Sequence, residues 1–254
     1  MFPELYILDF IIPMYPLCVA TGFLVGTAVL YWDFCKLEIK DKCAFPIMCF
    51  AEAGVIIGGK FLFLIINIQK LQKYLYKFGF FGLLAKTGYV FYGGLFGGLF
   101  AIWIFSKIFK KFFPESLMYI LSVSPLIHAF GRVGCFCSGC CYGIKYSGFL
   151  NVYMNNVRCF PVQLLEAVLL LFLFFILQQF LLKKRKYVIE FYFLGYGIIR
   201  FVCEFLRGDI ARGFLGALSI SSWISLLCVG IGCVIFAKNQ RKNTEINKDE
   251  VANT

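Results

Sequence analysis

The densest group of chemically capable side chains in this sequence lies in one window of sixteen residues, from position 128 to 143. It reads HAFGRVGCFCSGCCYG and holds the single histidine of the chain, one arginine and four cysteines. His128 and Arg132 are four residues apart, so on a helix they share one face. An arginine inside an apolar segment is costly and usually marks a functional site. Because a guanidinium stays charged when buried and binds phosphate through two parallel hydrogen bonds, the window predicts a phosphate site.

The two glycines beside this arginine, Gly131 and Gly134, allow a lipid headgroup or the backbone of a neighbouring helix to approach closely. The structural alternative is that Arg132 only forms an ion pair, with Glu52 or Glu204, because charges inside a membrane usually pair.

A second arginine lies in segment 196–209, which reads YGIIRFVCEFLRGD. Tyr196, Arg200 and Glu204 recur at every fourth position, so Arg200 is expected to pair with Glu204 along one helix face. Arg207 follows one turn later, where an arginine near the end of a span typically extends toward the membrane surface. Two buried arginines on separate spans predict a clamp that holds one phosphate group.

Glycines recur in segment 91–100, which reads FYGGLFGGLF. Gly93 and Gly97 form one pair with small-xxx-small spacing, and Gly94 with Gly98 forms another, a pattern most typical of close helix packing. The functional alternative is a glycine-lined groove in which Tyr92 faces a lipid headgroup.

The cysteines allow several interpretations. Of the twelve in the chain, four lie in CFCSGCC, at positions 135, 137, 140 and 141. Such a spacing can bind a soft metal or form disulfides. A metal would need a second pair of thiolates or histidines, and the other cysteines, such as Cys203, lie in apolar runs as small hydrophobic residues. We therefore expect the cluster to serve packing, with a disulfide left open and no metal.

The composition indicates where these residues must operate. Hydrophobic residues make up 61% of the chain, aromatic residues 19% and charged residues 15%. A water-soluble domain cannot bury that much apolar surface, so we expect an integral membrane protein of the all-α class. The net charge of +11 is then explained by cytoplasmic loops and anionic lipids, and we expect no nucleic-acid partner.

Seven apolar runs have the length of a membrane span, at about 16–32, 45–68, 88–105, 117–136, 162–182, 187–206 and 218–237. With the N-terminus outside, the inner segments carry fourteen Lys and Arg and the outer segments eight, which favours an N-out, C-in orientation. We expect one membrane domain over 1–237 and a polar, disordered cytoplasmic tail over 238–254.

In its motifs the chain resembles the bacterial prolipoprotein diacylglyceryl transferase family. The resemblance covers most of the chain, through MYPLCVATGF, IIGGKFLFLI, FYGGL, SPLIHAFGRVGCF, FPVQLLEA, YGIIRFVCEFLRGD and LSISSWIS in this order. The positions that match the family's site residues are Tyr15, Arg132, Gly143, Gln163, Glu166, Tyr196, Arg200, Glu204 and Arg207.

The chain departs from the family at several polar positions, which indicates a divergent branch. The family's asparagine after the GRxG arginine motif is Cys135 here, and its later asparagine and glutamate fall at Ser138 and Cys140. Its HGGL histidine falls at Tyr92, and its GGR arginine at Lys60.

The resemblance implies transfer of a diacylglyceryl group from phosphatidylglycerol to the lipobox cysteine thiol of a prolipoprotein signal peptide, in the bacterial inner membrane. Arg132 and Arg200 would hold the phosphodiester and stabilise its departing charge. The substrate thiol must lose its proton, and His128 or Tyr92 would replace the family histidine in that step. Lys60 and the glycines at 93, 94, 131 and 134 would contribute to lipid binding, and no cofactor is implied.

Other classes of function remain open from the sequence. The same scaffold would suit a non-catalytic protein that binds or transports membrane lipids, or a related transferase with another acceptor. A membrane protein built around the thiols and a soft metal is a third alternative.

Overall fold

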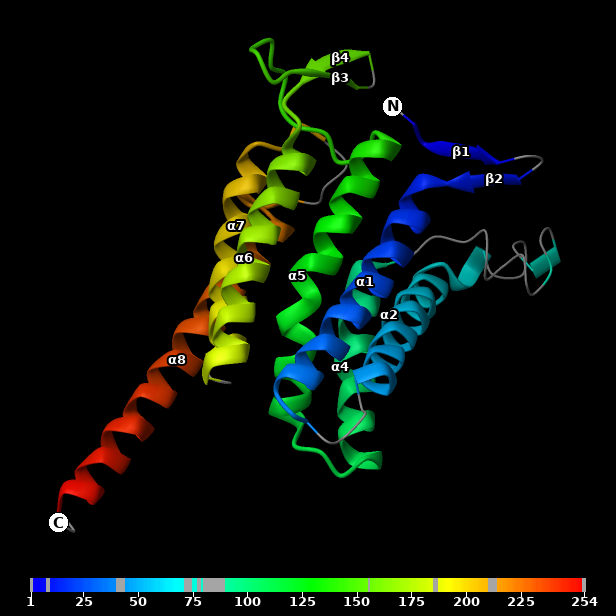
Figure 1. Cartoon of the computed structure of the whole chain (residues 1–254). Helices are drawn as coiled ribbons and strands as arrows, with labels where there is room; N and C mark the ends of the chain where they lie inside the picture. Colours follow the sequence, from blue (N-terminus) through cyan, green and yellow to red (C-terminus); the bar gives the residue numbers. More distant parts are fainter. Residues whose placement is uncertain are drawn as a thin grey trace. The chain divides into compact units, whose positions relative to one another are not determined.

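The structure is a computed structural model that describes residues 2–7, 10–39, 44–70, 75–76, 79, 90–154, 156–184, 187–209 and 214–252. These ranges contain seven α-helices (Figure 1): α1 Met14–Lys36, α2 Ala44–Ile66, α4 Phe91–Ile108, α5 Phe113–Ser138, α6 Val162–Lys184, α7 Val188–Phe205 and α8 Ile220–Ala252. Three antiparallel two-stranded hairpins accompany them: β1 Glu4–Ile7 with β2 Phe10–Pro13, β3 Val152–Met154 with β4 Val157–Cys159, and β5 Phe214–Leu215 with β6 Leu218–Ser219.

The expected all-helical membrane architecture is confirmed. Five helices, α1, α2, α5, α6 and α8, are long and apolar enough to cross a membrane, and α4 is a shorter apolar helix. The remaining helix, α7, carries three charged residues, Glu190, Arg200 and Glu204, within its 18 residues. Each of the seven apolar runs in the sequence coincides with one of these helices.

The expectation of a disordered tail after residue 237 is wrong, because α8 continues as one helix to Ala252. Extending an existing helix adds one hydrogen bond for each residue and avoids the cost of nucleation, so a polar sequence can prolong an apolar helix. The Asn239 side-chain amide also donates a hydrogen bond to Glu190 of α7.

The chain forms two compact units, and each is described by itself. One unit comprises residues 30–120, in which α2 and α4 lie side by side (Figure 1). A Cβ atom added at Gly93 would collide with the carbonyl oxygen of Gly58, and one added at Gly97 with that of Gly54. The prediction that the glycine pattern serves close helix packing is therefore confirmed.

The other unit comprises residues 1–29 and 121–254, with α6 packed on α7 and α7 on α8. Ala129 of α5 forms a buried cluster with Ala167 and Leu170 of α6, and Tyr196 of α7 packs against it. This packing brings the second half of α5, the first turns of α6 and the second half of α7 into one site.

Candidate functional site

A buried network of ion pairs joins three helices of the unit that comprises residues 1–29 and 121–254. The guanidinium of Arg132 on α5 lies 2.9 Å from the carboxylate of Glu166 on α6. Arg200 on α7 lies 3.4 Å from the other oxygen of the same carboxylate and 2.8 Å from Glu204. The Glu166 side chain is only 2% exposed. One carboxylate therefore holds the two arginines of the predicted phosphate clamp together.

The structure corrects one expectation about this network and bears out another. The predicted pairing of Arg200 with Glu204 is confirmed. Arg132, which the structural alternative paired with Glu52 or Glu204, pairs instead with Glu166. Spacing along the sequence identifies partners on the same helix, whereas a pair between helices depends on how the helices pack.

The network continues beyond the end of α7. Arg207 lies 3.8 Å from Glu204 and binds Asp209 through two hydrogen bonds, of 2.9 Å from Nε and 2.6 Å from a terminal nitrogen. Three guanidiniums thus face three carboxylates. Among the described residues, the Nε atom of Arg132 is buried and has no hydrogen-bond partner. A donor therefore stays available to an anion even when all the ion pairs are formed.

The single histidine lies at the edge of this network. The ring centroids of His128 and Tyr196 are 5.6 Å apart. The Tyr196 ring in turn stacks on that of Tyr192, with 5.8 Å between the centroids. Arg132 follows His128 by one turn on the same face of α5. The structure therefore brings together seven of the predicted site residues: His128, Arg132, Glu166, Tyr196, Arg200, Glu204 and Arg207.

Several predicted site residues fix the loop that follows α5. The Gln163 amide donates a 2.8 Å hydrogen bond to the carbonyl oxygen of Cys140. The backbone amide of Gly208 donates to the Tyr142 carbonyl at 3.0 Å, and Gly143 forms an antiparallel bridge with Arg207. A Cβ atom at Gly143 would collide with the carbonyl oxygen of Phe160. Gln163 and Gly143 thus have a clear role in positioning the backbone.

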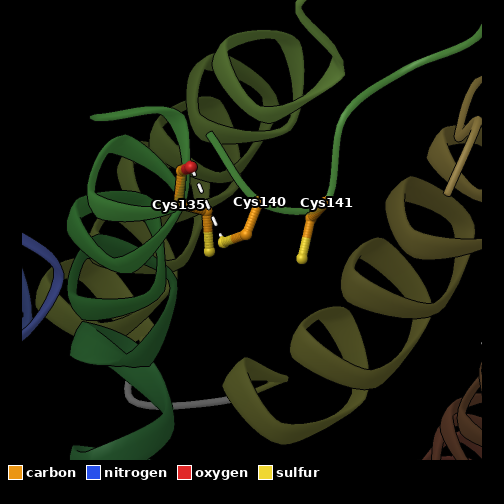
Figure 2. Close-up of side chains that lie close together, drawn as sticks. All are labelled: Cys135, Cys140 and Cys141. Atoms are coloured by element: carbon orange, nitrogen blue, oxygen red, sulfur yellow. Dashed lines mark hydrogen bonds between the residues drawn. The ribbon is translucent and has the colours of Figure 1, made fainter. Parts of the chain in front are cut away.

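This loop turns the chain so that three thiols meet. The sulfur atoms of Cys135, Cys140 and Cys141 all lie within 4.8 Å of one another, and Figure 2 shows the Cys140 thiol pointing toward Cys135 with Cys141 beside them. The backbone of Gly139 and Cys141 adopts the left-handed conformation, with φ of 68° and 57°. Sequence reasoning missed this grouping, because only the chain reversal after Ser138 reveals it.

The environment of Cys141, outside the helices, favours its thiolate. Hydrogen bonds from the Cys135 and Cys140 thiols lower the pKa of Cys141, and the positive charges of Arg207 and Arg132 lower it further. Cys137, although it lies in the same sequence motif, faces Cys18 of α1.

The remaining site candidates of this unit lie where α1 contacts α5. A Cβ atom at Gly134 would lie 3.2 Å from the Cα atom of Tyr15 and 3.1 Å from the Cβ atom of Cys18, so this glycine permits a close helix contact. A Cβ atom at Gly131 would lie 4.0 Å from a methyl carbon of Val19. Tyr15 itself is 45% exposed.

Four further candidates, Lys60, Tyr92, Gly93 and Gly94, belong to the unit of residues 30–120. The amide of Val90, just before α4, donates a 3.1 Å hydrogen bond to the Gly59 carbonyl of α2. Gly93 also lines an apolar groove of about 850 Å³ between these helices. The predicted binding roles of these four residues stay predictions.

Comparison with known proteins relates the chain to one family of membrane transferases. A family model described as prolipoprotein diacylglyceryl transferase matches residues 4–238. The phosphatidylglycerol–prolipoprotein diacylglyceryl transferase of Clostridium tetani is 29% identical over 234 residues, covering 87% of this chain and 91% of that protein. The second such enzyme of Clostridium perfringens is 30% identical over 241 residues, with the same coverage. The Campylobacter lari enzyme is 29% identical over 247 residues, covering 91% of this chain and 89% of its own.

Proposed function

The chain belongs to the prolipoprotein diacylglyceryl transferase family, and on this premise we propose how its buried network performs the transfer. The protein is a membrane transferase that moves a diacylglyceryl group from phosphatidylglycerol to a prolipoprotein. The acceptor atom is the thiol of the lipobox cysteine in the signal peptide, and glycerol phosphate is released. The observation that carries this proposal is the Glu166 carboxylate between Arg132 and Arg200.

The two arginines bind the phosphodiester and stabilise the charge that develops on it. A guanidinium has five N–H donors, and each ion pair of this network occupies only some of them. The buried Nε–H group of Arg132, which has no hydrogen-bond partner among the described residues, is the donor that we expect to bind a phosphate oxygen. Glu166 holds both guanidiniums in place before the lipid binds, so they need little reorganisation when the carbon–oxygen bond breaks. Such preorganisation of charged groups is the main source of electrostatic catalysis.

The attacking group is the substrate thiolate, since the thiol itself is a poor nucleophile. The sulfur forms a bond to the glycerol carbon, the bond from that carbon to the phosphate oxygen breaks, and the phosphate keeps the electron pair. His128 is the proton acceptor that lies within the described network, next to Tyr196. Tyr92, at the position of the family histidine, is the second candidate for this step.

We further propose that all seven helices cross the bacterial inner membrane, with the N-terminus outside. The excess of Lys and Arg in the segments assigned to the inside supports this orientation. A reporter fused after residue 237 that is active only outside the cell would contradict it.

The transfer reaction can be tested with the purified full-length protein in detergent. It is incubated with phosphatidylglycerol and a lipobox peptide, and the peptide is analysed by mass spectrometry. We expect the mass of one diacylglyceryl group on the cysteine peptide and no change in a matched serine peptide. Arg132→Ala and Arg200→Ala should lose the product. Lipid binding without any turnover would instead indicate a non-catalytic lipid-binding protein.

A further inference from the structure

The three thiols at the end of α5 have a geometry that the transfer reaction as described above leaves unused. Their sulfur atoms lie within 4.8 Å of one another. A zinc ion bound by thiolates at about 2.3 Å places its sulfur ligands roughly 3.8 Å apart in a tetrahedron. A disulfide would need about 2.05 Å between two sulfurs and would leave the third thiol out. The observed grouping is therefore within about 1 Å of the sulfur spacing that a zinc site requires, and it includes all three thiols.

The backbone holds the three thiols in place before any ion binds. The Cys140 amide donates a 3.1 Å hydrogen bond to the carbonyl of Cys135, and the Cys140 carbonyl accepts the amide of Gln163 at 2.8 Å. Cys141 has a φ of 57°, a conformation that residues other than glycine rarely adopt. This conformation persists only where the surroundings enforce it, and it directs the Cys141 thiol to the side of the other two (Figure 2).

The charges around the thiols suit an anionic metal centre. Three thiolates and one divalent ion carry a net charge of −1. Arg132 lies one turn before Cys135 on α5, and Arg207 is bridged to Gly143, two residues after Cys141. Both guanidiniums act electrostatically on Cys141. Two guanidiniums, each of which also pairs with a carboxylate, therefore lie near the proposed centre.

The site is also open on one side. Cys135 is buried, Cys141 is partly exposed and Cys140 is exposed. Structural zinc sites use four protein ligands, whereas catalytic zinc sites use three and leave the fourth position to water or substrate. In the sequence analysis, the lack of a fourth ligand was an argument against a metal site. In an open site, the fourth position is left to water or substrate, so three protein ligands are sufficient.

We propose that Cys135, Cys140 and Cys141 bind one thiophilic d10 cation, Zn²⁺, whose open fourth position binds the thiol of the acceptor peptide. The second half of this proposal rests on the proposed function. A thiol that coordinates zinc loses its proton to solvent and stays a thiolate at neutral pH. Its sulfur then attacks the glycerol carbon of the lipid held by the arginines, and glycerol phosphate leaves with the electron pair. In a chain with Tyr92 at the family's histidine position, the cation thereby supplies a route to the thiolate in addition to proton transfer to His128.

Metal binding is tested on the purified, reduced full-length protein. It is loaded with Zn²⁺, desalted and measured by elemental analysis. We expect one equivalent in the wild type and in Cys137→Ser, a matched control from the same motif whose thiol faces Cys18. We expect loss of the ion in a variant with serine at all three cluster positions. A wild type that binds no zinc, or a triple variant that keeps it, would overturn the proposal.

The open position is tested with Co²⁺ as a spectroscopic probe. The loaded protein should show thiolate-to-cobalt charge-transfer bands and the intense visible bands of a tetrahedral site. A cysteine lipobox peptide should change these bands, whereas the serine peptide should not. Equal spectra with both peptides would refute binding of the acceptor thiol.

Transfer assays separate this inference from the proposed function. Removal of zinc should lower the rate about 100-fold, the low end of what proton handling contributes, and added Zn²⁺ should restore it. Full transfer by the metal-free triple variant would refute the role of the cation and leave the transferase function standing. No transfer by any form, with the cobalt spectrum intact, would refute the transferase function and leave the metal site standing.

Discussion

Replacing Glu166 by glutamine tests whether this carboxylate holds the two arginines in place. The change keeps the shape of the side chain and removes its charge. At an effective dielectric constant of 20, contacts of 2.9 and 3.4 Å correspond to about 5 kcal/mol each before desolvation is counted. Because the neutral side chain also escapes the cost of burying a charge, we expect a net loss of stability of about 3–5 kcal/mol.

The effect on catalysis should exceed the effect on stability. With its carboxylate gone, Arg132 and Arg200 repel each other and no longer converge, so we expect transfer to fall by about 100-fold or more among the molecules that stay folded. Glu190→Gln is the matched control, because this carboxylate on α7 is also buried and contacts Asn239. The readouts are the midpoint of thermal unfolding in detergent and the transfer rate for each folded molecule. A Glu166→Gln protein with the unfolding midpoint and rate of the wild type would refute this account of the network.

Three further substitutions test other parts of the site and the fold. Arg132→Lys should lower the transfer rate about 100-fold, because lysine cannot form two parallel hydrogen bonds to one phosphate, and wild-type kinetics in that variant would contradict a bidentate role. His128→Ala should change the rate and its dependence on pH, whereas a wild-type profile in that variant together with loss of turnover in Tyr92→Phe would identify the tyrosine as the proton acceptor. Gly97→Leu should destabilise the protein by about 1–3 kcal/mol because its side chain would meet the Gly54 backbone of α2, as measured by thermal unfolding against Gly230→Ala, a glycine with no neighbour within 4 Å of an added Cβ.

The sequence predicts those features of the fold that depend on periodicity along one segment. The seven helices follow from apolar runs of membrane length, and the pair of Arg200 and Glu204 follows from their spacing of four. The glycines near Gly93 predict that α4 packs closely on another helix, but the sequence does not identify α2 as that helix. The bridge from Arg132 to Glu166 could not be read in this way, because the two residues lie on different helices.

The thiol cluster escaped prediction for a related reason. Cys135 lies in the last turn of α5, whereas Cys140 and Cys141 lie in the loop that follows it. The course of this loop depends on the left-handed backbone of Gly139 and Cys141 and on the hydrogen bond from Gln163 of α6. Spacings of five and six residues do not place side chains on one face of a helix, so the sequence favours packing and cannot identify which three thiols meet.

The charges on α7 have a consequence for how the protein enters the membrane. On insertion scales, a charged residue at the centre of a helix costs about 2.5–3.5 kcal/mol. In α7, Arg200 lies in the second half of the helix and Glu204 in its last turn, so this figure is an upper limit for each. This helix is therefore a poor candidate for partitioning into lipid by itself. Its arginine already meets Glu166 of α6, the helix that precedes it in the chain, within the folded unit. The two helices should accordingly leave the insertion machinery as a pair, with the ion pair formed before either is exposed to lipid, so that residues of the proposed catalytic network would also govern biogenesis.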